Sequence, residues 1–247
     1  MAGHSARAAR RRAWVATMLA LLVALLVAVA AVFLAMAVSV GQRGMGGGVG
    51  GGAGRIAPPL VAPVELMPLT IADARAANMA QPFATTAMVA APPLRFIGGP
   101  DDAQRAVHCL TAALLYEAGD DGDGQRAVAQ VVLNRARHPA FPATICGVVF
   151  QGSERRTGCQ FSFTCDGALQ RRYPAEMWQR AQGNAILALN GFVYAPVGLA
   201  THYHTDWVRP YWSPSLDKVA QVGTHLFFRW PGWWGTAAAF RRGVSGQ

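Results

Sequence analysis

Apolar and small residues recur at helical spacing near the middle of the chain, at Ala103, Val107, Leu110, Leu114 and Ala118. A stripe with this spacing is typical of a helix that buries one face. Asp101 is followed three residues later by Gln104, a pattern that resembles a capping box, so the sequence predicts a helix over about residues 103–118. Gly119 is expected to end that helix in a left-handed conformation.

A second stripe of mainly apolar residues follows an acidic turn and predicts a second helix that ends before Pro139. The stripe consists of Ala127, Val128, Val131, Val132 and Arg135. Asp123 is expected to cap the start of this helix. The turn over residues 120–124 lacks the alternating ligands and the closing Glu of a calcium-binding loop, so we interpret it as a solvated connector.

The C-terminal half predicts shorter elements of both kinds. Residues 145–150 fit one or two helical turns, and residues 174–190 fit a longer helix that starts with Pro and stops at Asn-Gly. Alternation over residues 201–204 predicts a strand, and residues 221–230 predict a last one. The folded domain is therefore expected to cover residues 101–235.

The first hundred residues show neither the helical spacing nor the strand alternation of the expected domain. Residues 13–42 hold no charged side chain, and this run exceeds the roughly 20 apolar residues that cross a bilayer. Four Arg residues within residues 1–12 predict that this end of the chain stays in the cytoplasm. We therefore expect an uncleaved transmembrane helix, with residues 43–247 on the far side of the membrane. Cleavage near Ala37 would instead release a secreted form.

Two further segments flank the expected domain. Residues 43–100 are rich in Gly, Pro and Ala, a composition that predicts a disordered linker able to hold a domain away from a bilayer. Within this stretch, residues 67–79 fit either a short helix or a disordered Ala-rich segment. Residues 236–247 are expected to form a basic tail.

The distribution of charge narrows the choice of partners. The 247 residues carry a formal net charge of +9, of which residues 1–100 contribute +6 and residues 101–247 contribute +3. The expected domain has a single lysine, Lys218. A nucleic-acid-binding domain concentrates Lys and Arg on its own surface, so we expect no nucleic-acid partner.

All four cysteines of the chain fall in the expected domain. A domain outside the cytoplasm is in an oxidising compartment, where disulfides form. Of the three possible pairings we prefer Cys159 with Cys165 and Cys109 with Cys146, because this choice needs one local loop and one link across the helical pair.

Glu117 is the first candidate for chemistry, because it falls on the last turn of the first predicted helix. The carbonyl end of a helix disfavours a negative charge, and apolar neighbours such as Leu114 raise the pKa of a carboxyl group. Both effects favour a protonated acid. The alternative is a solvated Glu beside a Gly-rich loop.

A polar and aromatic strip between two cysteines supplies further candidates. Gln160, Phe161 and Ser162 lie in this strip, whose composition suits the wall of a carbohydrate groove. A disulfide-closed loop with aromatic residues in the core would explain Phe161 equally well, but explains Gln160 and Ser162 less well.

Two histidines are candidate metal ligands. His202 and His204 point to the same side of a regular strand, and with Asp206 they could in principle hold zinc. No HExxH or CxxC spacing supports such a site. We therefore expect no metal and no cofactor, and interpret the two histidines as hydrogen-bonding wall residues.

Three separated motifs together resemble a known family. They are LLYEAGDDGDGQRAVAQVVLNRARHPAFPATICGVVFQ, CQFSFTCDG and ATHYHTDWVRPYWSPSLDKVAQVGTHLFFR, and they cover nearly all of residues 105–230. These motifs resemble the catalytic domain of the SleB-type spore cortex-lytic cell wall hydrolases. The resemblance implies an α+β, mainly helical, lysozyme-like fold with a small β-sheet, and cleavage of peptidoglycan glycan strands. The loop GDDGDG after Glu117 departs from the family pattern, which is richer in Arg and Glu, and this puts the shape of the loop in question.

The resemblance also implies roles for individual residues. Glu117 would be the catalytic acid, and the residues expected to line the groove beside it are Gln160, Phe161, Ser162, Thr201, His202 and Tyr203. Trp212 is added as an aromatic that could stack on a sugar ring. The expected partners are peptidoglycan glycan strands and, through the N-terminal helix, the inner membrane of a bacterium, with the domain in the periplasm. No protein partner is predicted from the sequence.

The expected reaction follows from the number of carboxylates. A hydrolase ordinarily adds a second carboxylate roughly 5 to 10 Å from the acid, for which the candidates are Asp166, Asp206 and Asp217. A lytic transglycosylase needs one acid, since the C6 hydroxyl of muramic acid attacks C1 and the same Glu takes its proton. We therefore expect a membrane-anchored lytic transglycosylase that cuts between N-acetylmuramic acid and N-acetylglucosamine. The alternatives are a muramidase or glucosaminidase with a second Asp, a non-catalytic wall-binding module, and a metal-dependent hydrolase or amidase.

Overall fold

The computed structural model describes residues 57–61 and 63–246. The predicted cytoplasmic segment, residues 1–12, and the predicted membrane span, residues 13–42, lie outside the described residues. None of the helices in the described part of the chain is long and apolar enough to cross a membrane. By their contacts, residues 57–247 form one unit, which is larger at both ends than the domain expected from the sequence.

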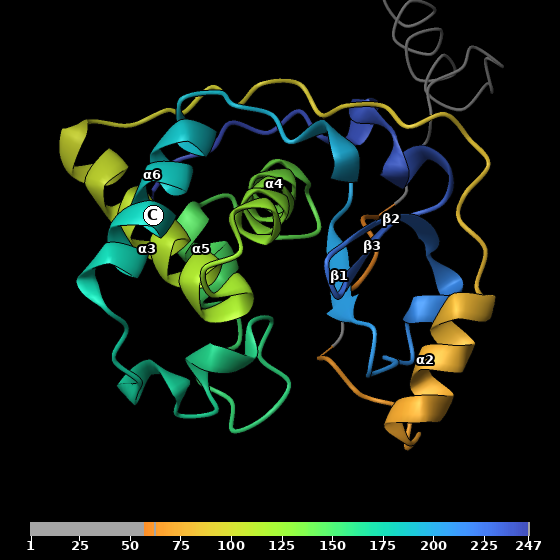
Figure 1. The fold of residues 1–247 in the computed structure, drawn as a ribbon. Coiled ribbons are helices and arrows are strands. Elements are labelled where there is room, and N and C mark those ends of the chain that lie inside the picture. The colour runs from red at the N-terminus through yellow and green to blue at the C-terminus, as the bar shows by residue number, and fades with distance from the viewer. Residues whose placement is uncertain (1–56, 62, 247) are drawn as a thin grey trace, which may run out of the picture. The chain divides into compact units, whose positions relative to one another are not determined.

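Four of the α-helices build the helical layer (Figure 1). α3 (Pro100–Ala118) packs against α4 (Gly122–Arg137), α5 (Ile145–Val149) and α6 (Ala175–Leu189). The core between these helices consists of fully buried aliphatic residues, among them Leu110, Leu114, Leu115, Val128, Val132 and Ile145. Each such side chain contributes roughly 1.5–3 kcal/mol by its burial, so the predicted apolar stripes hold the helical layer together.

The helices lie where the periodicity predicts them, but two of the predicted caps are wrong. Gly99 occupies the N-cap position of α3 and Pro100 its first position, so Asp101 lies inside the first turn. Pro suits this position because its missing N–H would have no partner there. α4 is capped by Asp121, whose carboxylate accepts a hydrogen bond from the backbone N–H of Asp123 at 3.1 Å.

A small antiparallel sheet forms the second part of the fold. Its strands are β1 (His202–Thr205), β2 (Asp217–Val222) and β3 (His225–Arg229), in the spatial order β1-β3-β2. The single last strand predicted over residues 221–230 is wrong, because the chain turns at Gly223 and forms a β2–β3 hairpin. Gly223 has a φ of 54°, a conformation that side chains with a Cβ rarely adopt.

Helix α4 lies between the other helices and the sheet (Figure 1). On its sheet side, Ala127 and Val131 pack against Phe227 of β3. Tyr203 of β1 lies opposite Phe227 in the strand register and packs against the same cluster. Most of α4 is therefore buried, because the helix packs both against the other helices and against the sheet.

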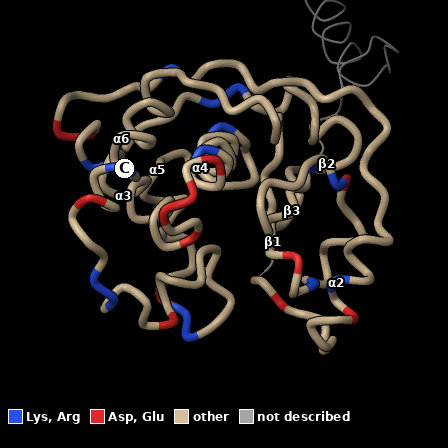
Figure 2. Tube along the Cα trace, in the orientation of Figure 1, with Lys and Arg blue, Asp and Glu red and all other residues tan. Residues whose placement is uncertain are grey.

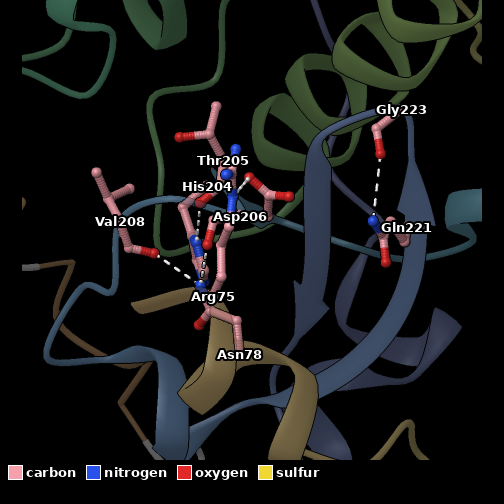
Figure 3. A network of polar contacts seen from close by, with 8 residues as sticks. All are labelled: Arg75, Asn78, His204, Thr205, Asp206, Val208, Gln221 and Gly223. Atoms are coloured by element: carbon pink, nitrogen blue, oxygen red, sulfur yellow. Dashed lines mark hydrogen bonds and ion pairs between the residues drawn. The ribbon is translucent and has the colours of Figure 1, made fainter. Parts of the chain in front are cut away.

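Residues 57–100, predicted as a disordered linker, differ most from expectation. They contain α2 (Ile71–Ala80), which lies on the sheet side of the fold (Figure 1). Asn78 of this helix is only 2% exposed, and its amide donates hydrogen bonds to the backbone carbonyls of Asp206 at 2.8 Å and Val208 at 2.9 Å (Figure 3). The second half of the predicted linker is thus part of the folded unit.

Charged side chains strengthen the attachment of α2. Arg209 donates a hydrogen bond to the side-chain oxygen of Asn78 at 2.8 Å, and Lys218 donates one to the Asn78 backbone carbonyl at 2.9 Å. Arg75 reaches Asp206 at 3.3 Å (Figure 3). The Arg75 pair is solvent-exposed and contributes little, whereas the buried bonds around Asn78 contribute roughly 0.5–1.5 kcal/mol each.

The predicted basic tail, residues 236–247, also differs from expectation. Val244 is 1% exposed and pairs with Phe96 through an isolated bridge. Arg242 donates hydrogen bonds to the backbone carbonyls of Ala136 and His138, at the end of α4. The described part of this segment therefore returns to the helical layer, and Arg242, one of its two basic side chains, bonds backbone carbonyls at the end of α4.

Both predicted disulfides are present and include all four cysteines. Cys109 of α3 is joined to Cys146 of α5, which links two helices that also pack through their apolar faces. Cys159 is joined to Cys165 and closes a loop of six residues. The preferred pairing is confirmed.

The acidic loop after α3 has structural partners. Asp120 forms two hydrogen bonds of 2.7 Å with Arg180 of α6, and Asp123 forms one of 2.7 Å with Arg126. Figure 2 shows that charged residues elsewhere in the described unit are scattered in ones and twos along the chain, with both signs present. Electrostatic effects in a buried site therefore depend on the few charged groups that line it.

Candidate active site

A cavity of about 570 Å³ takes its wall from α3, α4, β1 and the loops that follow α5 and β1. Its polar and aromatic lining includes Glu117, Arg135, Gln160, Ser162, Asp166, His202, Tyr203 and Trp212. The chain ahead of α2 adds Val64 and Leu66 to the wall. Residues from six separate stretches of sequence thus meet around one space, which is large enough for a small substrate segment.

Glu117 lies on the last turn of α3 and lines the cavity, as expected from the helical period. The phenol of Tyr203 donates a hydrogen bond of 2.9 Å to its Oε2 atom. Gly119 follows with a φ of 56°, so the helix ends at Ala118, one residue after the acid. The carboxyl group is therefore held between a helix end and the first strand of the sheet.

Burial raises the pKa of Glu117 to about 7, because an ionised carboxylate loses hydration inside the cavity wall. The hydrogen bond from Tyr203 and the charge of Arg135 lower this pKa, and the negative charge of Asp166 raises it. The effect of burial is the largest of these. At neutral pH the group is divided between the protonated acid and the carboxylate, so it can give a proton and take one back.

Tyr203 is the direct partner of the acid. Burial raises the pKa of its phenol well above the ordinary value, so the hydroxyl stays protonated and remains a donor. Its ring packs near Phe227, with centroids 5.7 Å apart, and near Phe161, with centroids 6.4 Å apart. These contacts fix the direction in which the hydroxyl points at Glu117.

The second motif, Gln160 to Ser162, divides between the cavity and the core. Gln160 and Ser162 line the cavity, as expected. Phe161 is 1% exposed and packs in the helical core, so it supports the wall from behind instead of facing the cavity. The Cys159–Cys165 disulfide closes this loop and also lines the cavity.

The third motif divides in the same way. His202 and Tyr203 line the cavity, whereas Thr201 has no exposed surface. The Thr201 hydroxyl lies 3.0 Å from Nδ1 of His202, and this contact holds the imidazole in place. Trp212 lines the cavity, with its ring centroid 5.1 Å from that of His202.

His202 and His204 point to the same side of β1, as expected, but each has other partners. His204 places Nδ1 2.9 Å from the carbonyl of Thr205 and Nε2 3.2 Å from the hydroxyl of Ser213. Asp206 turns to Arg75. Within the described residues, no group of three or more His, Cys, Asp or Glu side chains is arranged to hold a metal ion.

The three candidates for a second carboxylate are separated by the fold. Asp166 lines the cavity, and its Oδ1 accepts a hydrogen bond of 2.8 Å from the backbone N–H of Ala168. Asp206 is bound by Arg75, and Asp217 lies 3.5 Å from Arg229. Neither of these two residues lines the cavity, so Asp166 is the carboxylate that the described fold brings near Glu117.

Sequence reasoning missed Arg135 as a site residue. The sequence predicts Arg135 at the end of the apolar stripe on the second helix, and this position gave no reason to assign it to a site. In the structure it is 4% exposed and lines the cavity. The available signal was a charged residue in register with Val128, Val131 and Val132 on a face that otherwise contains apolar side chains.

A carboxylic acid with a pKa near neutrality, hydrogen-bonded by a tyrosine inside a cavity, defines an acid–base site. Cleavage of a glycosidic bond requires a protonated acid of this kind on the leaving oxygen. A site of this kind suits an enzyme that uses a carboxylic acid as its general acid.

Comparison with known families agrees with this class. Residues 119–228 match the family described as Cell Wall Hydrolase. The resemblance to the SleB-type spore cortex-lytic enzymes is thereby confirmed. Glu117 lies two residues before the matched stretch.

Individual relatives carry the name spore cortex-lytic enzyme. The protein of Halalkalibacterium halodurans is 33% identical over 123 residues, which are 49% of this chain and 34% of that protein. The protein of Oceanobacillus iheyensis is 30% identical over 126 residues, 50% of this chain and 41% of that protein. The protein of Bacillus subtilis is 28% identical over 122 residues, 49% of this chain and 36% of that protein. The matches thus span well under half the length of these relatives.

Two solved structures are also similar. The catalytic domain of the Bacillus cereus SleB protein is 26% identical, with a TM-score of 0.43, over 54% of this chain and 95% of that domain. The catalytic domain of SleB from Bacillus anthracis, described as a germination-specific lytic transglycosylase, is 27% identical with a TM-score of 0.43, over 53% of this chain and 100% of that domain.

Proposed function

We propose that this protein cleaves peptidoglycan glycan strands as a lytic transglycosylase, at the bond between N-acetylmuramic acid and N-acetylglucosamine, with Glu117 as general acid and then general base. The observation that carries the proposal is the pKa of Glu117, about 7, in a cavity wall where Tyr203 fixes the carboxyl group. A group with this pKa serves both proton transfers near neutral pH, so one side chain is sufficient.

The first step breaks the glycosidic bond. Protonated Glu117 gives its proton to the oxygen that links the two sugars, while the bond from this oxygen to C1 of muramic acid breaks and C1 takes on oxocarbenium character. The N-acetylglucosamine part leaves with a free hydroxyl group. Glu117 is then a carboxylate that still accepts the hydrogen bond from Tyr203.

The second step closes the ring of the product. The C6 hydroxyl of the same muramic acid attacks C1, and its proton passes to the Glu117 carboxylate. The product ends in 1,6-anhydro-muramic acid, no water is consumed, and the enzyme returns to its starting protonation state. Gln160, Ser162 and His202, which line the cavity, are the proposed contacts for the strand, together with the ring of Trp212.

A hydrolase mechanism is the second candidate function, and the position of Asp166 is the observation that favours it. This carboxylate lines the same cavity and is close enough to raise the pKa of Glu117. In a hydrolase it would activate a water molecule or attack C1, and the product would be a reducing sugar end. Its hydrogen bond with the backbone of Ala168 also gives it an ordinary role as a turn residue.

We also propose that the N-terminal segment anchors the protein in the bacterial inner membrane, with the domain in the periplasm. The charge-free run over residues 13–42 and the Arg residues ahead of it support this arrangement. Both disulfides fit an oxidising compartment. Release after cleavage near Ala37 is the alternative form.

The deciding experiment is mass spectrometry of the fragments that the protein releases from purified peptidoglycan. The proposal expects 1,6-anhydro-muramic ends, each one water lighter than a hydrolysed end. Reducing ends that disappear in Asp166→Asn would establish the hydrolase instead. Binding to peptidoglycan without soluble fragments would indicate a wall-binding module, and a loss of activity with a chelator would indicate a metal-dependent enzyme.

A further inference from the structure

Arg135 carries a buried charge that has no part in the two proton transfers described above. Its side chain is 4% exposed, and no carboxylate in the described part of the chain lies within 4.0 Å of it. Its Nη1 atom is buried and has no hydrogen-bond partner among the described residues. A guanidinium group stays charged at any physiological pH, so this arrangement is unfavourable unless the charge has a task.

The guanidinium is held in one orientation. Its Nε donates a hydrogen bond of 2.7 Å to the backbone carbonyl of Thr201, directly ahead of β1. Its central carbon lies 5.2 Å from the ring centroid of Phe161, 5.3 Å from that of Phe141 and 5.9 Å from that of Tyr203. These contacts occupy Nε and the faces of the group. Nη1 is left without a hydrogen-bond partner among the described residues, in a side chain that lines the cavity.

The groups that act on Glu117 come from three parts of the fold. Tyr203 approaches from β1, Arg135 from α4 and Asp166 from the loop before α6. His202 and His225 line the same cavity and stay neutral, because burial lowers the pKa of both imidazoles. The exposed Arg156 also lines the cavity. Arg135 is therefore the buried cation of this set, and its positive charge lowers the pKa of Glu117.

We infer that Arg135 is a positioning residue that stabilises the Glu117 carboxylate in the interval between the two proton transfers. The inference rests on the proposed function, since it assigns a role within the acid-then-base cycle. When Glu117 gives up its proton, a negative charge appears in a buried site that contains a fixed, unpaired donor. Arg135 supplies the opposite charge from a fixed position at the moment it is needed, with no reorganisation of solvent.

The same helix offers a matched control. Arg137 is 5% exposed, and its Nη1 donates to the backbone carbonyl of Pro92. Like Arg135 it has one buried nitrogen without a partner, in this case Nε. It does not line the cavity. Replacing Arg137 therefore measures the general effect of removing a buried guanidinium from α4, without a change in the charge near Glu117.

The test is the pH dependence of kcat/KM for peptidoglycan cleavage in four proteins, namely wild type, Arg135→Gln, Arg135→Lys and Arg137→Gln. Glu117 must be protonated to act as an acid, so kcat/KM falls as pH rises through its pKa. Removing the positive charge of Arg135 raises that pKa, so the alkaline limb should move to higher pH in Arg135→Gln. The limb should stay in place in Arg135→Lys and in Arg137→Gln. We expect kcat of Arg135→Gln to fall about 10²-fold, since the carboxylate intermediate loses its stabilising charge.

Three outcomes separate the possibilities. An alkaline limb that stays in place in Arg135→Gln, or that moves equally in Arg137→Gln, overturns the inference and leaves Arg135 as a structural residue. Wild-type protein that yields no anhydro ends overturns the proposed function instead. If circular dichroism shows that Arg135→Gln is unfolded, Arg135→Met is used in its place. The flexible apolar side chain of Met can fill the same space among Phe141, Phe161 and Tyr203.

Discussion

The protonation of one side chain depends on contacts from both parts of the fold. Glu117 belongs to α3, its hydrogen-bond donor Tyr203 belongs to β1, and the charge that opposes the effect of burial comes from Arg135 on α4. Burial alone would hold the carboxyl group in its neutral form. The donor and the cation bring its pKa back to about 7, where both protonation states are accessible.

The first prediction concerns the acid itself. Glu117→Gln keeps the shape of the side chain and its ability to accept a hydrogen bond from Tyr203, but it can neither give nor take the proton. Positioned acid–base catalysis contributes ~10² to 10⁴ in rate, so release of soluble fragments should fall by at least that factor. The thermal unfolding midpoint and the binding of glycan strands should be retained. A fully active Glu117→Gln protein would contradict the whole assignment.

The second prediction concerns its donor. Tyr203→Phe keeps the ring among its aromatic neighbours and removes only the hydroxyl group that bonds Glu117. Since this bond lowers the pKa of Glu117, that pKa should rise and the alkaline limb of kcat/KM should move to higher pH. Loss of a hydrogen bond to a charged group costs roughly 1.5–3 kcal/mol, or about a 10- to 100-fold drop in kcat. Tyr116→Phe is the control, because Tyr116 lies on the same helix as Glu117 but its hydroxyl bonds to the backbone of Leu169 and Arg171.

Among single residues, sequence reasoning found those that stand out locally. Glu117 could be found from the sequence because a carboxylate at the end of an apolar helical stripe is unusual by itself. Arg135 could not be found in this way, because the residues that bury it include Thr201 and Phe161, which lie far along the chain. Phe161 and Thr201 were placed in the right region but on the wrong side of the cavity wall. Packing decides whether a side chain faces the cavity or the core, and a sequence motif does not show this.

At the scale of elements, helices α3, α4 and α6 were predictable because each has its own hydrophobic period. Helix α5 was predictable from a short apolar run over residues 145–150, and strand β1 from the alternation over residues 201–204. Helix α2 was ambiguous because its attachment is mostly polar. Asn78 is held by carbonyls and side chains about 130 residues away, and no local pattern records such partners. The β2–β3 hairpin was missed because the strand predicted over residues 221–230 runs through Gly223, which is the turn between β2 and β3.

The third prediction tests whether α2 is part of the catalytic unit. Asn78→Ala removes two donors and an acceptor from a buried site, so the free energy of unfolding should fall by about 1–3 kcal/mol. The loop over residues 206–212 should also loosen, which should raise KM for glycan strands because Val208, Pro210 and Trp212 line the cavity. Urea unfolding and initial-rate kinetics measure the two effects.

Met79→Ala is the matched control for that prediction. Met79 is the next residue of α2 and is 82% exposed, so its truncation should change the free energy of unfolding by no more than about 0.5 kcal/mol. Equal stability of the Asn78→Ala and Met79→Ala proteins would show that α2 is attached only loosely.

For the molecule as a whole, the fourth prediction concerns its placement across the membrane. The proposed anchor puts the folded unit outside the cytoplasm, so protease added to spheroplasts should digest it while cytoplasmic marker proteins stay intact. The fragment that remains in the membrane should include residues 13–42. Protection of the folded unit while a periplasmic control is digested would refute this orientation. Recovery of the intact unit in the soluble fraction would favour cleavage near Ala37.

If the N-terminal segment is anchored as proposed, the position of the first described residues determines how far from the membrane the cavity can reach. Val61 and Val64 line the cavity, and Leu66 pairs with Pro210, which also lines it, so the chain enters the folded unit at the wall of this cavity. A residue spans at most roughly 3.3–3.6 Å, so the number of residues ahead of this point sets an upper limit on the distance between membrane and cavity. With the N-terminal segment anchored as proposed, shortening the chain would reduce the depth of peptidoglycan that can be cut, while the rate of cutting within that depth stays the same.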